Sequence, residues 1–96
     1  MLTFEEFKQA SAIVESIVQD EFDINTAKTV LEEATSKVAT GKKRDFYGHM
    51  SRLFLNVMLN RLNELGEKAK ANAIIARQMI TELIQEQRKK GELKHV

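Results

Sequence analysis

The sequence predicts a small all-α protein, either a four-helix bundle or a set of helical hairpins, in a single domain spanning residues 1–96. Three observations support this prediction. The chain contains no proline and only four glycines, so it is poor in the turns that a sheet protein needs. Apolar residues recur at helical spacing, whereas no stretch sustains apolar–polar alternation. With 96 residues, 43% of them hydrophobic, the chain can bury only one small core, and we expect dimerisation to complete it.

The first helix is expected over residues 4–21. Thr3 and Glu6 have the spacing of a capping box, in which each side chain accepts a hydrogen bond from the other residue's backbone N–H. The spacing of the apolar residues predicts one buried face, which consists of Phe4, Phe7, Ala10, Val14, Ile17 and Val18.

The second helix is expected over residues 26–40. Asp23 or Asn25 can cap its start, and Gly41 is a typical residue just beyond a helix end. Its apolar residues again recur at helical spacing and are Ala27, Val30, Leu31, Ala34 and Val38.

The third helix is expected over residues 46–65, with Asp45 as its cap. Apolar residues cover more than half of its circumference, which predicts either a central helix or a helix shared with a second subunit. A narrow polar strip remains, formed by Arg52, Asn56, Asn60 and Asn63.

The fourth helix is expected over residues 67–90, ending at Gly91 and followed by a tail over 91–96. Its alanines allow close approach to a neighbouring helix. Because no good cap precedes Glu67, a second possibility stays open, in which the third and fourth helices form one long helix kinked at Gly66.

Composition excludes several classes of site. The absence of cysteine rules out disulfides and thiolate chemistry. No run of 18 apolar residues exists, so no membrane partner is expected. The first twenty residues carry four acidic residues and one lysine, the reverse of a signal peptide. These features predict a cytoplasmic protein.

Charge is divided unevenly along the chain. Residues 1–33 contain eight acidic and two basic residues, a balance of −6, and residues 34–96 contain thirteen basic and six acidic residues, a balance of +7. This asymmetry can guide the choice of a partner or self-association, and it can equally reflect packing of an acidic half on a basic half.

Two basic clusters suggest phosphate contact as an alternative function. The residues concerned are Lys42, Lys43, Arg44, Arg88, Lys89 and Lys90. A helix-turn-helix would need the third helix to present polar side chains to base edges. That helix instead begins with Phe46 and continues through apolar residues, so sequence-specific reading of DNA is disfavoured.

One compact polar group stands out, formed by Asp45, Tyr47, His49 and Arg52. A zinc site needs three or four ligands, and catalysis needs an acid–base pair with a group that polarises the substrate. This group supplies neither, and no phosphate-binding loop or nucleophile motif occurs. We therefore expect no catalytic residue, metal, cofactor or small-molecule substrate.

The function expected from these features is protein–protein contact. We expect a small, non-enzymatic regulatory, inhibitor or adaptor protein of bacterial or phage type, which binds a protein partner, a second copy of itself, or both. The expected interface lies on the third helix and consists of Tyr47, Gly48, Arg52, Leu55, Asn56, Leu59, Asn60 and Asn63.

Overall fold

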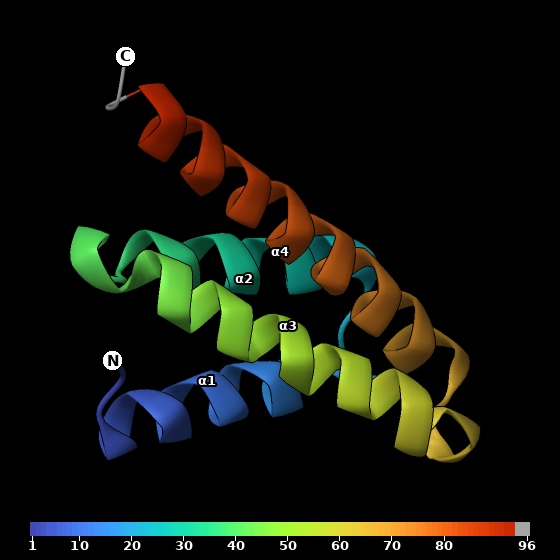
Figure 1. Ribbon diagram of the computed structural model, residues 1–96. Coiled ribbons are helices and arrows are strands. Elements are labelled where there is room, and N and C mark those ends of the chain that lie inside the picture. Colours follow the sequence, from blue (N-terminus) through green and yellow to red (C-terminus); the bar gives the residue numbers. More distant parts are fainter. Residues whose placement is uncertain (94–96) are drawn as a thin grey trace.

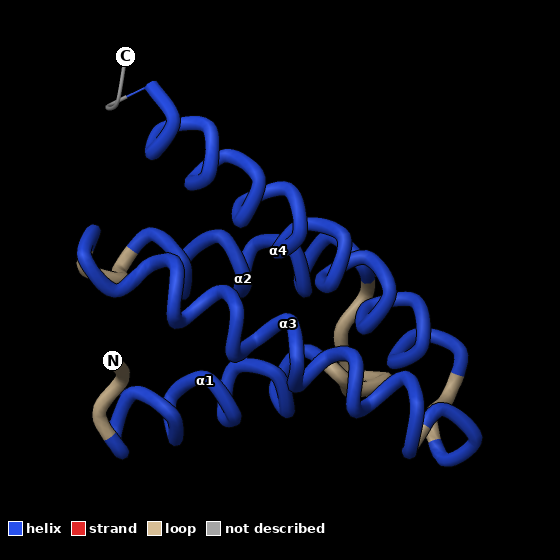
Figure 2. Tube along the Cα trace, viewed as in Figure 1, coloured by secondary structure: helices blue, strands red, loops and turns tan. Residues whose placement is uncertain are grey.

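The computed structural model describes residues 1–93 and contains four α-helices and no strand in that range. The helices are α1 (Phe4–Ile17), α2 (Ile24–Ser36), α3 (Lys43–Asn60) and α4 (Glu67–Leu93). Two short 3-10 helices, η1 (Thr40–Lys42) and η2 (Leu62–Glu64), flank α3. Figures 1 and 2 show the arrangement: α3 lies between α1 and α4, and α2 packs behind them. The prediction of a compact all-α, four-helix protein is confirmed.

The starts of α1 and α2 are determined locally, as the sequence predicts. The Thr3 N–H donates to Glu6 Oε1 at 2.9 Å and the Glu6 N–H donates to Thr3 Oγ1 at 3.2 Å, which completes the capping box. At α2, the Thr26 N–H donates to Asp23 Oδ1 at 2.8 Å, so Asp23 is the cap.

The helix ends differ from the predicted ones. Both α1 and α2 are shorter than expected, ending at Ile17 and Ser36, and Gly41 lies inside η1. Asp45 lies in the first turn of α3 and does not cap it, because the helix already begins at Lys43. Helix α4 continues through Gly91 to Leu93, and residues 94–96 of the predicted tail lie outside the described residues.

The alternative prediction, in which the third and fourth helices form one long helix kinked at Gly66, is wrong. Helix α3 ends at Asn60, η2 follows, and α4 returns alongside α3 (Figure 1). The physical reason is burial, because a continuous rod would leave the apolar faces of both helices uncovered.

The core lies where all four helices meet. Its largest fully buried side chains are Phe54, Ile17, Leu31, Met50, Ile80, Val14 and Asn72. The predicted faces of α1 and α2 largely contribute to it, but Phe4 and Phe7 are exceptions, with 73% and 38% of their surface exposed. The ring centroid of Phe4 lies 5.1 Å from the ammonium group of Lys8. Burial along α1 itself begins at Ala10, although Leu2, which precedes the helix, is also buried in the core.

The start of α4 is held by polar contacts from the α1–α2 connection, and we call this junction, formed by Asp20, Gly66, Ala69 and Asn72, the tied end. The Ala69 N–H donates to Asp20 Oδ1 at 3.0 Å, so a residue far away in sequence supplies the missing cap of α4. A Cβ at Gly66 would overlap the Asp20 carboxylate. Glycine at 66 therefore makes room for the cap.

Asn72 completes the tied end. Its side chain is fully buried, and its Nδ2 donates to the carbonyl oxygens of Ile17, Gln19 and Phe22 at 3.2, 3.3 and 2.9 Å. These carbonyls belong to the end of α1 and the turn that follows, where helical partners are missing. One amide side chain thus fastens the α1–α2 connection to α4.

Candidate functional site

The polar group predicted around Asp45 is dispersed in the structure. The Asp45 carboxylate lies 3.1 Å from the amino terminus. His49 makes an edge-to-face contact with Phe7, with ring centroids 4.7 Å apart. Tyr47 faces inward and is 2% exposed, with its hydroxyl 3.5 Å from the Thr35 carbonyl oxygen. Arg52 is exposed. These residues turn to different neighbours and do not converge on a common point.

Two of these groups have displaced pKa values. Burial raises the pKa of Tyr47, and the nearby charge of Glu86 adds to that rise. Partial burial lowers the pKa of His49, and the positive charge of Arg52 lowers it further. Both shifts favour the neutral forms. Among the described residues, no group of three or more His, Asp or Glu side chains could hold a metal ion.

The predicted interface residues fall into four separate places. Tyr47 is 2% exposed and belongs to the core, so it does not lie on the solvent side of α3. Asn56 and Asn60 line a groove of about 200 Å³ between α1 and α3, which the Arg61–Glu15 ion pair borders. Asn63 is exposed in η2. The remaining predicted residues lie on the solvent side of α3 and are Gly48, Arg52, Leu55 and Leu59.

Those four residues form part of a surface that we call the outer face. Together with Arg44 they recur every three or four positions, so they follow one line along α3. The opposite side of α3 carries the buried residues Phe46, Met50, Phe54 and Val57. The line is largely apolar at its C-terminal half, where Leu59 is 71% exposed and Leu55 is half-buried.

Helix α4 contributes a second line to the outer face. Its residues share one side of the helix and are Lys70, Ile74, Arg77, Thr81 and Arg88. None of them lines either of the hollows that α4 forms with α2. Ile74 is 49% exposed, and the buried Nε of the half-buried Arg77 has no protein hydrogen-bond partner. Of this line the sequence-based prediction named only Arg88, because the other members show no apolar or charged cluster in the sequence.

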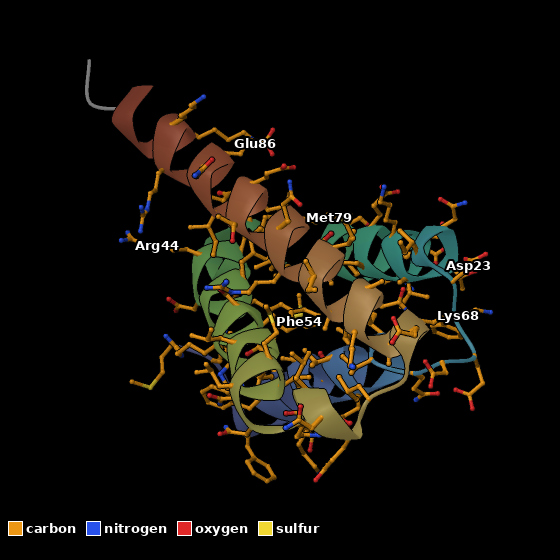
Figure 3. All side chains as sticks on the ribbon, turned by 90° about the vertical axis from the view of Figure 1, so that its right-hand side faces the viewer. Asp23, Arg44, Phe54, Lys68, Met79 and Glu86 are labelled. Atoms are coloured by element: carbon orange, nitrogen blue, oxygen red, sulfur yellow. The ribbon has the colours of Figure 1, made fainter. Side chains whose placement is uncertain are left out.

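The two lines give the outer face a consistent character. Exposed or half-exposed apolar side chains lie among basic ones, and neither line contains an acidic residue. Figure 3 shows Arg44 on one side of the molecule and Met79 and Glu86 on the opposite side of α4. The outer face is therefore separate from the surface between α4 and α2.

A cleft of about 380 Å³ opens on that opposite side, between α2, α4 and the start of α3. Its floor is largely apolar, and Glu32, Glu82 and Glu86 line it together with a single basic residue, Lys43. The complete lining is Leu31, Glu32, Thr35, Ser36, Lys43, Tyr47, Met79, Glu82, Leu83 and Glu86. The sequence-based prediction missed this cleft, although the clustering of Glu82 and Glu86 on α4 was visible.

The predicted basic residues have different surroundings. Lys42 forms an ion pair with Glu6 at 2.9 Å and donates to the Met1 carbonyl oxygen at 3.2 Å. Lys43 lines the cleft, and Arg44 is exposed on the outer face. The three basic residues at positions 88–90 are exposed near the end of α4. The structure therefore does not gather the basic residues into one continuous patch.

Comparison with protein-family models, with curated proteins and with solved structures gave no significant match. Within the described residues, no helix is long and apolar enough to cross a membrane.

Proposed function

We propose that this protein is a small, non-enzymatic regulatory, inhibitor or adaptor protein, and that the outer face is its contact surface for a protein partner. The observation that carries the proposal is the exposure of Leu59 and Ile74, at 71% and 49%, on two helices that pack together. An apolar centre with a polar rim is the usual composition of a protein interface.

The charges of the outer face indicate the chemistry of the partner. Its rim is basic, so an acidic surface or an acidic amphipathic helix would complement it. The half-buried Arg77 takes part in none of the ion pairs between described residues, and a carboxylate of a bound protein would pair with its charge.

The same charges disfavour a symmetric dimer through this face. In a two-fold dimer each surface meets its own copy, so Arg52 and Arg77 would face basic residues of the second copy. These charges favour a different surface for dimerisation.

Gly48 is consistent with a close contact. A Cβ added at Gly48 would meet no atom within 4 Å, so packing inside the bundle does not explain a glycine in the helix. Close approach of a partner's backbone would explain it.

The test is capture of a partner from a lysate of the source cells, with the tagged chain as bait. Leu59→Asp should leave the melting temperature unchanged and abolish capture. Phe4→Asp is the matched control, because Phe4 is 73% exposed and lies on α1, outside the outer face; it should retain capture. Equal capture by the wild type and by Leu59→Asp would refute this surface.

Nucleic-acid binding is the alternative proposal. It is supported by the position of Arg44 and of residues 88–90, which lie at the end of the α3–α4 pair where α3 begins and α4 ends (Figure 1). Binding of a labelled duplex should then weaken by orders of magnitude between about 50 and about 200 mM salt. Absence of binding at the lower salt concentration would reject this alternative.

A further inference from the structure

The far end of α4 has features that the outer face does not use. We call residues 85–93 of α4, together with the cleft, the open end. Helix α4 has 27 residues, so it is about 40 Å long at about 1.5 Å per residue. Figure 1 shows its last turns diverging from α2 and α3, and residues 85–90 are exposed except for the half-buried Gln87.

Charge is arranged in opposite blocks along one side of this helix. Glu82 and Glu86 line the cleft, and Lys89 and Lys90 follow within the next turn. Helical spacing places Lys90 on the same side as Glu86, four residues earlier, and Lys89 on the same side as Glu82, seven residues earlier. Arg88 lies on the opposite side, in the line of the outer face.

None of the ion pairs between described residues uses these charges. The four pairs join Met1 to Asp45, Glu5 to Lys8, Glu6 to Lys42 and Glu15 to Arg61. The cleft therefore presents three carboxylates against one lysine, and the end of α4 presents lysines beyond the elements that pack on its first turns.

We infer that the cleft receives the end of α4 from a second copy of this chain, in a symmetric antiparallel dimer. Antiparallel packing of two α4 helices about residues 86 and 87 brings Glu82 of each copy beside Lys90 of the other. Glu86 lies next to the two-fold axis, where its nearest basic residue on the facing side of the other copy is Lys89, two residues along the helix, and where the two Glu86 carboxylates flank the axis. The interface is isologous, so each favourable charge contact occurs twice. The apolar floor of the cleft receives the aliphatic stems of the lysines.

This dimer uses a different surface from the outer face, so it does not rest on the proposed function. The outer face stays open in the dimer and is presented twice. A partner and a second copy can therefore bind at the same time.

Complementary charge reversal tests the inference, with the mass in solution measured by light scattering over a tenfold range of concentration. The wild type should form a dimer at the upper concentrations. Two variants, Glu82→Lys/Glu86→Lys and Lys89→Glu/Lys90→Glu, should each be monomeric at the same concentrations. An equimolar mixture of the two should restore the dimer, because each cleft then faces an end of opposite charge.

Matched controls separate this contact from general charge effects. Arg88→Glu reverses a charge on the other side of the same helix end and should leave the dimer intact. Glu21→Lys/Glu33→Lys reverses two exposed carboxylates outside the cleft and should also leave it intact. Circular dichroism should show that all variants keep the helical content of the wild type.

Several results would overturn the inference. A monomeric wild type over the whole range would do so, as would dimers that survive either charge-reversed variant. Growth beyond the dimer would show a head-to-tail contact and exclude the two-fold arrangement. A mixture that stays monomeric would show that the two charge blocks do not meet.

Discussion

The two ends of α4 differ in how the chain has satisfied their polar groups. At the tied end, Asp20 and Asn72 meet residues distant in sequence, and the backbone donors and acceptors there find partners within the chain. At the open end, the carboxylates of the cleft and the lysines of residues 89 and 90 take part in none of the ion pairs between described residues. Groups satisfied internally stabilise the fold, whereas charged groups left without partners are available for binding.

The largest expected loss of stability comes from a substitution in the core, which lies between the two ends of α4. Phe54 is fully buried on α3, so Phe54→Ala should lower the free energy of unfolding by about 3–5 kcal/mol. Urea denaturation followed by circular dichroism measures the change. A variant as stable as the wild type would show that α3 is not the central helix.

The next effect concerns the tied end. Asn72→Ala removes the donor shared by three carbonyl oxygens and should lower the free energy of unfolding by about 1–3 kcal/mol. The Oδ1 of Asn72 is buried without a hydrogen-bond partner, so the loss comes from the donor side of the amide. Gln78 carries the same amide group at an exposed position of the same helix, and Gln78→Ala is therefore the matched control, with almost no expected loss. Equal stability of the two variants would contradict the role given to Asn72.

A pair of glycine substitutions sharpens the comparison. Gly66→Ala should destabilise the fold by about 0.5–2 kcal/mol, because the added Cβ displaces the Asp20 carboxylate from the start of α4. Gly48→Ala should stabilise it by about 0.5–1 kcal/mol, because its Cβ meets nothing within 4 Å and alanine favours a helix. Thermal unfolding measures the sign of both changes in stability. A stabilising effect of Gly66→Ala would contradict the role given to Gly66 at the tied end.

The cap can be verified by a double-mutant cycle. Asp20→Ala should destabilise about as much as Gly66→Ala, and the double variant should cost little more than either alone, since both remove the same contact. Full additivity would show that the two residues act independently.

The smallest effect is a dependence on pH at the start of α1. Hydrogen bonding to Lys42 and Thr3 lowers the pKa of the Glu6 carboxyl from its ordinary 4.5 to about 2. The folded state holds this carboxylate ionised, so its contribution to stability is present above pH 4.5 and is lost as the pH falls towards about 2.

In Glu6→Gln, stability should therefore fall less steeply over that range than in the wild type. Glu5→Gln removes a neighbouring carboxylate that pairs only with Lys8 at 3.7 Å, and it should retain the wild-type slope. Identical slopes for Glu6→Gln and the wild type would argue against the lowered pKa.

The sequence predicted what depends on residues close together in the chain. Thr3 with Glu6, and Asp23 with its own helix, are local pairs, so the starts of α1 and α2 were accessible. The cap of α4 was not, because Asp20 lies 49 residues before Ala69 and no local pattern connects them. The role of residue 72 was missed for the same reason, although a polar residue beside the alanine stripe of α4 was a visible anomaly.

The candidate surfaces were predicted less completely. The line on α3 was anticipated through Gly48, Arg52, Leu55 and Leu59, since surplus apolar residues on one helix are visible in the sequence. Tyr47 was placed on that surface but is buried, because periodicity alone does not tell which of several apolar sides faces the core. The cleft depends on how α2 packs against α4, which no spacing within one helix reveals.

Amide hydrogen exchange along α4, measured by NMR at a low and at a high protein concentration, tests the contrast between its two ends most directly. Residues 69–80 should be strongly protected at both concentrations, because the tied end and the core hold them. Residues 85–90 should exchange rapidly in dilute solution and become protected as the concentration rises and a second copy covers them. Uniform protection along the helix, unchanged by concentration, would contradict the division of α4 into a tied end and an open end.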